Sequence, residues 1–176
     1  MTLAQTRARA ILEGLGIRPQ SASVAILVAW QAAEGVDAYA NNPLATENPN
    51  GANGLYNAAG VRTYPTEAAG VAATVQTLGA YPGIVAALRA ASPTKFLAQT
   101  AELQTWCGCD EAQYAANIAS RIGVPYTPPG GTGPSSSTVV SAAKAAKKIP
   151  PWVGWIALGA PAGALIIDAI ERGRGH

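Results

Sequence analysis

Residues 22–34, ASVAILVAWQAAE, decide the fold of this chain. The helix that this segment predicts would carry apolar side chains around most of its circumference, and such a helix is buried on most sides. Ser21 or Ser23 is expected to cap its start, and Gly35 to end it. The segment therefore predicts the most deeply buried helix of the domain.

Helical spacing of apolar residues recurs on both sides of this segment. Thr66, Ser92 and Asp110 are candidate N-caps of later helices, because their side chains can accept a hydrogen bond from a free backbone N–H. In the first helix, Arg7 and Arg9 are expected to lie away from the apolar face. The predicted helices cover residues 3–15, 22–34, 66–78, 83–90, 92–103 and 110–122. The sequence thus predicts an all-α domain of five to seven helices.

Residues 36–65 interrupt this helical pattern with many asparagines, glycines and prolines. These residue types favour turns, so the stretch is expected to be a long irregular loop or to contain a small hairpin. A loop of this length inside a compact domain usually has a function. Tyrosine and leucine side chains spaced through it could anchor it to the core.

The C-terminal part of the chain differs in composition from the rest. We predict a helical domain over residues 1–124, a flexible linker over 125–137 and an apolar, basic helix within 138–176. Residues 149–167 carry no charged side chain, and the run falls within the ~17–25 residues of a membrane-spanning helix. The segment 149–170 is expected either to enter a lipid membrane or to pack against a partner protein.

The composition excludes some classes of function. The net charge of +2 is too small to indicate nucleic-acid binding, and no basic patch is interleaved with aromatic residues. Cys107 and Cys109 cannot supply the four ligands of a structural zinc site, so no metal and no cofactor is expected. Two idle thiols are favoured over a disulfide or redox pair. Residues 1–20 contain charged side chains and no continuous apolar core, so they do not resemble a signal peptide.

Glu34 is the main candidate for catalysis. It closes the apolar helix just before Gly35 and the polar loop. Burial disfavours the carboxylate, and the C-terminal end of the helix presents partial negative charge, so both effects raise the pKa of Glu34. A carboxyl that keeps its proton near neutral pH can act as a general acid on a glycosidic oxygen. Trp30, one helical turn earlier, is expected in the core on the same side of the helix.

The order of these features resembles the lysozyme superfamily of goose-type lysozymes and lytic transglycosylases. A glutamate ends a buried helix, a polar loop follows, and the next helix contains an internal glycine. The chain is more similar to lysozyme-like domains in virion and tail proteins of phages that infect actinobacteria. The segments that carry this similarity are residues 42–46, NPLAT, and residues 56–64, YNAAGVRTY.

The resemblance implies a lysozyme-like fold and cleavage of the glycan strand of peptidoglycan, with Glu34 as the catalytic residue. It also implies a set of residues that contact the sugar, namely Tyr56, Asn57, Tyr64, Asn42 and Asn53. A second acid, Asp37 or Glu47, would be needed for hydrolysis by two carboxylates. A lytic transglycosylase works with one glutamate, and the single strong candidate acid favours that chemistry slightly.

Two functions follow from the sequence. The chain is expected to belong to a phage virion and to act at the bacterial cell wall, with peptidoglycan, other virion proteins and a lipid membrane as partners. The alternative is a structural virion protein that keeps the lysozyme-like fold with little or no activity. An open groove beside Glu34 would favour the enzyme, and a filled groove the structural protein.

Overall fold

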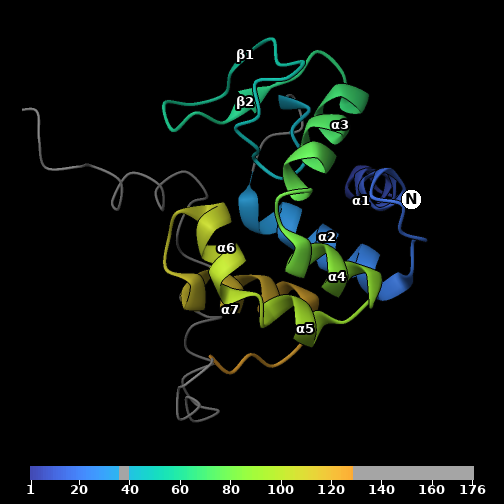
Figure 1. The fold of residues 1–176 in the computed structure, drawn as a ribbon, viewed down its shortest axis with the longest axis vertical. Coiled ribbons are helices and arrows are strands. Elements are labelled where there is room, and N and C mark those ends of the chain that lie inside the picture. Colours follow the sequence, from blue (N-terminus) through green and yellow to red (C-terminus); the bar gives the residue numbers. More distant parts are fainter. Residues whose placement is uncertain (36–39, 129–176) are drawn as a thin grey trace, which may run out of the picture.

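The computed structural model describes residues 1–35 and 40–128, which form a mostly helical fold with one small hairpin (Figure 1). The helices and strands are α1 (Leu3–Gly14), α2 (Ser21–Glu34), β1 (Gly54–Leu55), β2 (Arg62–Thr63), α3 (Glu67–Leu78), α4 (Pro82–Arg89), α5 (Pro93–Leu97), α6 (Thr100–Cys107) and α7 (Glu111–Ile122). The prediction of an all-α domain is confirmed for these residues. The helix expected within 138–176 lies outside them, and so does residue 37.

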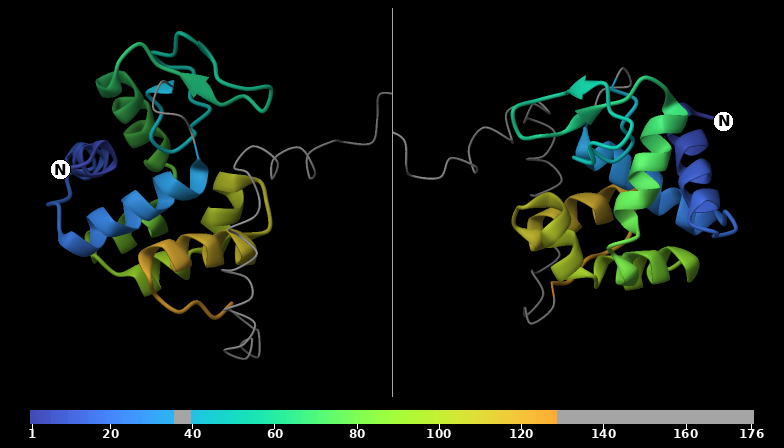
Figure 2. Two further views of the ribbon diagram at one scale, coloured as in Figure 1. Left: turned by 180° about the vertical axis from the view of Figure 1, so that it is seen from behind. Right: turned by 45° about the horizontal axis from the view of Figure 1, so that its top comes forward.

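Helix α2 lies at the centre of the fold. It contacts α1, α4, α5 and α7, and Figure 2 shows α1 and α7 on different sides of it. Ile26, Leu27 and Trp30 have no exposed surface, so Trp30 is a core residue as predicted. Its indole packs edge-on against Phe96, with 5.2 Å between the ring centres. Burial of this apolar helix is the main reason that the others gather around it.

The predicted N-caps of the later helices are confirmed. The side chains of Thr66, Ser92 and Asp110 accept hydrogen bonds from backbone N–H groups of α3, α5 and α7. At α2 the prediction was wrong, because Gln20 precedes the helix as its N-cap. The Ser23 hydroxyl instead accepts a hydrogen bond from the Gln20 backbone N–H at 3.1 Å.

Two helix ends also bear on the predictions. Gly35, with φ of 64°, ends α2 in the left-handed conformation that glycine adopts without strain. The single helix expected over 92–103 is divided into α5 and α6.

The folded part of the chain extends past residue 124, where the domain was predicted to end. Tyr126, which the composition assigned to the linker, packs against the core.

The polar loop contains a small hairpin, one of the two forms expected. Its strands are antiparallel, with Gly54 opposite Thr63 and Leu55 opposite Arg62. The loop is tied to α3 through Asn48, whose side-chain amide donates to the Ala73 carbonyl oxygen at 3.3 Å. In Figure 2 the hairpin lies at one end of the molecule, beside α3 and above the end of α2.

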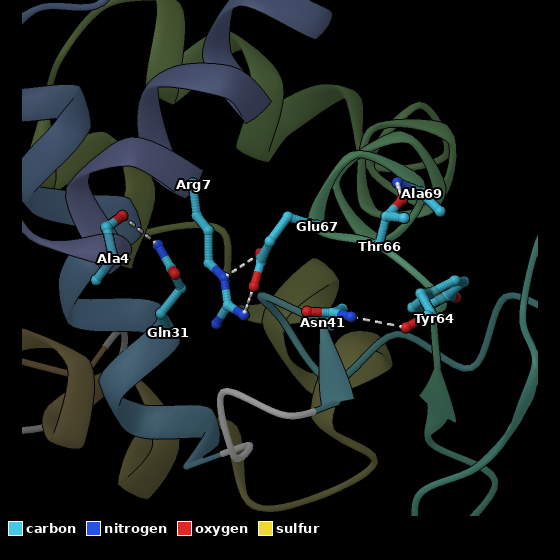
Figure 3. Close-up of polar contacts among 8 residues, drawn as sticks. All are labelled: Ala4, Arg7, Gln31, Asn41, Tyr64, Thr66, Glu67 and Ala69. Atoms are coloured by element: carbon cyan, nitrogen blue, oxygen red, sulfur yellow. Dashed lines mark hydrogen bonds and ion pairs between the residues drawn. The ribbon is translucent and has the colours of Figure 1, made fainter.

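An ion pair joins α1 to α3. The Arg7 guanidinium donates to both carboxylate oxygens of Glu67, at 2.6 and 2.5 Å (Figure 3). The prediction that Arg7 lies away from the buried face was wrong, since only 7% of it is exposed. Arg7 can be buried because α3 supplies a carboxylate opposite it, and a buried charge needs such a partner. Gln31 links α2 to α1 in the same region by donating to the Ala4 carbonyl oxygen at 3.0 Å.

Among the described residues, no single helix is long and apolar enough to cross a membrane. Helices α3 and α4 have that length and composition only together, and a bend of 110° separates them. The predicted membrane or partner segment, 149–170, is outside the part of the chain that the structure describes.

Gly70 lets the loop approach α3 closely. A Cβ atom at this position would lie 1.5 Å from the Asn41 backbone carbonyl oxygen. Asn41 in turn donates from its side-chain amide to the Tyr64 carbonyl oxygen at 2.8 Å (Figure 3). The contact therefore fixes the start of the loop against the helix that follows it.

We expect Gly70→Ala to lower the free energy of unfolding by about 1–3 kcal/mol or more, because backbone atoms must move to admit the methyl group. Denaturant titration measures this loss. Gly83→Ala in α4 is the comparison. Its new methyl group would meet side-chain atoms of Gln99 and Glu102 and no backbone atom, so it should cost less, although Glu102 also accepts from the Gly83 N–H. Wild-type stability of Gly70→Ala would show that the close approach is not required.

Candidate functional site

Three hydrogen-bond donors converge on one oxygen atom of Glu34. The indole N–H groups of Trp30 and Trp106 each donate to Glu34 Oε1 at 3.0 Å. The Tyr114 hydroxyl donates to the same oxygen. The Trp30 N–H also lies 2.5 Å from the Tyr114 hydroxyl oxygen, so the four side chains form one buried polar cluster.

Three helices supply this cluster. Trp30 and Glu34 are one turn apart on α2, which places their side chains on the same face. Trp106 comes from the last turn of α6, and Tyr114 from α7. The ring of Trp106 packs edge-on against Trp30, with 4.9 Å between the ring centres, and against Tyr81, with 5.2 Å. This aromatic packing fixes the directions of the two indole N–H groups.

Burial controls the acidity of Glu34. Only 6% of the residue is exposed. Desolvation raises its pKa from 4.5 to about 7, although the hydrogen bonds from Tyr114, Trp106 and Trp30 act in the opposite direction. The predicted rise of the pKa, and burial as its cause, are thus confirmed. The Tyr114 phenol stays neutral, because burial and the nearby Glu34 raise its pKa well above 10.

The cluster also determines which oxygen carries the proton. An indole N–H can only donate, and two of them point at Oε1. A hydrogen on Oε1 would oppose both, so the neutral acid carries its hydrogen on Oε2. The proton that Glu34 can release is therefore held at a defined atom.

A small pocket lies beside Trp106, with a volume of about 170 Å³. Glu34 does not line it, and Trp106 is the residue that touches both. The other lining residues come from the loop, from α3, from the turn before α4 and from α6; they are Ala45, Thr46, Glu47, Thr77, Tyr81 and Thr105. Hydroxyl groups and aromatic rings together suit a carbohydrate. The Thr77 and Thr105 hydroxyls donate to backbone carbonyls of their own helices, so they can bind a sugar hydroxyl only as acceptors, and aromatic rings can pack on the C–H faces of the sugar.

A larger hollow of about 540 Å³ lies elsewhere, between α1 and α3. Ala68, Ala72, Val71 and Val75 form much of its α3 side. It is almost wholly apolar and contains none of the four cluster residues. The smaller pocket is therefore the better candidate for a polar substrate.

Two of the predicted sugar-binding residues lie inside the loop. The Asn42 side chain is fully buried and bonds to backbone atoms of Thr46 and Arg62. Tyr64 is 1% exposed, and its hydroxyl donates to the Asn48 carbonyl oxygen at 2.5 Å. Neither side chain faces an open groove, so both act by holding the loop in shape.

The other predicted sugar-binding residues are exposed on the hairpin. The Asn57 side chain accepts hydrogen bonds from the Ala59 and Val61 N–H groups and shapes the turn. Asn53 accepts from the Thr63 hydroxyl at 3.0 Å, and Tyr56 is 42% exposed. Their contact with substrate remains a prediction.

Of the two candidate second acids, the structure describes one, Glu47. Glu47 lines the pocket beside Trp106. Burial raises the pKa of the nearby Tyr81 phenol, and the negative charges of Glu102 and Glu47 raise it further. Asp37 lies outside the described residues. Within those residues, no three Asp, Glu, His or Cys side chains gather where they could hold a metal ion.

Sequence reasoning missed Trp106, Tyr114 and Tyr81 as members of the site. Trp106 and Tyr114 lie 72 and 80 positions after Glu34, so no local pattern connects them with it. The available signal was chemical. Buried Trp and Tyr need a partner for their N–H and O–H groups, and the Glu34 carboxyl at the end of the apolar helix is an acceptor that could have served.

Cys107 and Cys109 form a disulfide, so the expectation of two idle thiols was wrong. Gly108 adopts the left-handed conformation at the end of α6, with φ of 61°. This turn brings the two cysteine Cα atoms to 5.1 Å, within the range that a disulfide spans.

The chain was compared with protein families, curated proteins and solved structures, and no relative was found.

The raised pKa of Glu34 makes the stability of the fold depend on pH. Between pH values of about 4.5 and 7 the folded protein keeps a proton that the unfolded chain has released, so wild-type stability falls as the pH rises through this window. Glu34→Gln removes the titration. We expect its stability relative to wild type to improve by roughly 3 kcal/mol between about pH 4 and about pH 8, at about 1.4 kcal/mol per pKa unit.

Denaturant titrations of both proteins at the two pH values measure this difference. Glu13→Gln on the exposed side of α1 is the control, because its carboxyl is solvated. An equal difference between Glu34→Gln and wild type at both pH values would contradict the raised pKa.

Proposed function

We propose that this chain carries a lysozyme-like domain that cleaves the glycan strand of peptidoglycan, with Glu34 as the general acid. The observation that supports this most strongly is the Glu34 carboxyl itself. Its pKa of about 7 means that a large fraction of the molecules keep this carboxyl protonated at neutral pH. It lies next to Trp106, which borders a pocket lined with hydroxyl groups. The glutamate at the end of a buried helix, followed by a loop with a hairpin, also fits the resemblance to the lysozyme superfamily.

In the proposed reaction, Glu34 donates the proton on Oε2 to the oxygen of the scissile glycosidic bond as that bond breaks. The negative charge left on the carboxylate is then stabilised by the three donors to Oε1, because hydrogen bonds to a charged acceptor are the stronger ones. The same carboxylate can next take the proton of a hydroxyl group of the same sugar as that oxygen bonds to the anomeric carbon, which forms the anhydro-sugar and restores the neutral acid. One glutamate therefore serves as acid and then as base, as in a lytic transglycosylase.

Hydrolysis with a second carboxylate is the other form of this proposal. Glu47 is the described candidate, since it lines the pocket on the side of the loop. It would act as a base on a water molecule, which an inverting enzyme places between two carboxyl groups. Products from purified peptidoglycan separate the two reactions, because hydrolysis leaves reducing ends and transglycosylation leaves anhydro-sugars.

A structural virion protein is the second candidate function. The burial of Glu34 favours it, because 6% exposure leaves little of the carboxyl open to a substrate and Trp106 stands between it and the pocket. Under either function, the resemblance to phage proteins supports the proposal that the chain belongs to a virion that meets the bacterial cell wall. Other virion proteins would then be its partners.

Glu34→Gln should reduce peptidoglycan cleavage by at least about 10²–10⁴-fold, the usual contribution of general acid catalysis. The amide keeps the shape of the side chain and an acceptor oxygen for the three donors, but it has no acidic proton. Release of soluble glycan fragments measures the loss, and Glu13→Gln should retain activity. An inactive wild-type protein would favour the structural function, and an active Glu34→Gln would exclude Glu34 as the acid.

The uncharged segment 149–167 generates a separate prediction about partners. Removing residues 138–176 should leave a soluble, folded domain, whereas the full chain should bind liposomes or self-associate, because so large an apolar surface marks an interaction site. Flotation with anionic liposomes and sedimentation velocity measure the two outcomes. A full-length chain that stays monomeric and does not bind liposomes would contradict both forms of this prediction.

A further inference from the structure

The disulfide lies within the turn that connects two of the donors to Glu34. Trp106 directly precedes Cys107, the last residue of α6. Gly108, Cys109 and the N-cap residue Asp110 follow, and then α7 begins, which carries Tyr114. The Cys109 backbone N–H also donates to Cys107 Sγ at 3.1 Å. The disulfide thus closes the turn that separates the helix of one donor from the helix of the other.

The two helices are anchored to the core to different degrees. In α7, Tyr114, Ala115, Ile118 and Ala119 are buried. In α6, Leu103 is the single buried residue, and Trp106 itself is only partly buried. A short helix with so little buried surface frays easily at its end. The ring of Trp106 packs against Trp30 and Tyr81, and the disulfide adds a second constraint on the last turn of α6, where the Trp106 N–H lies 3.0 Å from Glu34 Oε1.

We infer that Trp106 is a positioning residue for the Glu34 carboxyl and that the Cys107–Cys109 disulfide holds it there by closing the turn between α6 and α7. This inference rests on the proposed function for its role in catalysis. The position of Trp106 gives it a second effect, since its ring also borders the pocket beside the site.

Reduction of the disulfide would release this constraint. Both cysteines are partly exposed, so an external dithiol can reach them. One thiolate of the dithiol attacks a sulfur of the disulfide, and its second thiol resolves the mixed disulfide. The protein gains two electrons and two protons and ends with two thiols, while the dithiol is oxidised to a disulfide. With the turn open, the Trp106 N–H would leave Oε1 for part of the time.

Loss of the Trp106 hydrogen bond can be measured through the pKa of Glu34, and the titratable groups that the structure describes near the site are few. Tyr114 is the titratable side chain, among the described residues, that bonds to Glu34, and it stays neutral. On α6, Glu102 is bound to the Gly83 and Ile84 N–H groups. At the start of α7, Glu111 and Asp110 lie near Tyr126, and their charges add to the effect of burial in raising the pKa of that phenol. Loss of the Trp106 hydrogen bond removes a contact that favours the carboxylate, so the pKa of Glu34 should rise.

The test is the titration of Glu34 by NMR in full-length protein labelled with ¹³C at glutamate carboxyl groups. Trp106→Phe keeps an aromatic ring but removes the N–H donor, and it should raise the pKa of Glu34 by about one unit, given the usual strength of a hydrogen bond to a charged group. The double variant Cys107→Ser, Cys109→Ser should change it in the same direction. Dithiothreitol should reproduce that change in the wild type and have no further effect on the double variant.

Tyr81→Phe is the matched control, because it alters a ring in contact with Trp106 without removing a hydrogen bond to Glu34. It should leave the pKa of Glu34 unchanged. An unchanged pKa in Trp106→Phe would overturn the positioning role. A higher pKa in Trp106→Phe, with no effect of dithiothreitol or of the double variant, would overturn the role of the disulfide.

Activity separates this inference from the proposed function. The pH profile of peptidoglycan cleavage should move with the NMR pKa in each variant, which a purely structural role of Trp106 would not produce. A wild-type protein without cleavage would contradict the proposed function alone, because the NMR titration needs no substrate. Movement of the pKa without movement of the pH profile would overturn the catalytic role of Trp106.

Discussion

The burial of the Glu34 carboxyl is the constraint on which the arrangement of this domain depends. A carboxyl group that is removed from water loses its hydration and must find hydrogen bonds inside the protein. Here Trp30, Trp106 and Tyr114 supply them from α2, α6 and α7. The same bonds join α6 and α7 to the end of the central helix, in addition to the apolar packing between these helices. Packing and acidity at this point are therefore set by one group of contacts.

The polar loop serves the site in a different way. Its asparagine-rich composition suggested a surface that binds sugar, yet Asn42 and Asn48 bond mainly to the protein's own backbone and side chains. These bonds replace the regular ladder of a larger sheet and hold the loop over α3. The loop can then present Glu47 and Thr46 to the pocket. An irregular segment needs such internal partners, because its backbone groups are not paired by helix or strand.

Predictions from local chemistry were confirmed where the partner lay nearby. Thr66, Ser92 and Asp110 cap helices because each accepts from an N–H group only three residues away. Arg7 was placed wrongly because its partner, Glu67, lies 60 positions away. Cys107 and Cys109 are close in sequence, but the left-handed conformation of Gly108 that joins them was not anticipated.

The sequence by itself determined that Glu34 ends a buried helix and that its pKa is raised, because both follow from the apolar segment before it. It also determined the helical class of the domain through the spacing of apolar residues. Only the tertiary structure decided which groups surround the carboxyl, which oxygen they bind and which pocket lies beside them. Trp106 and Tyr114 lie 72 and 80 positions beyond Glu34, and helices can pack in many ways at that separation. The packing of α6 and α7 on α2 selects one of them.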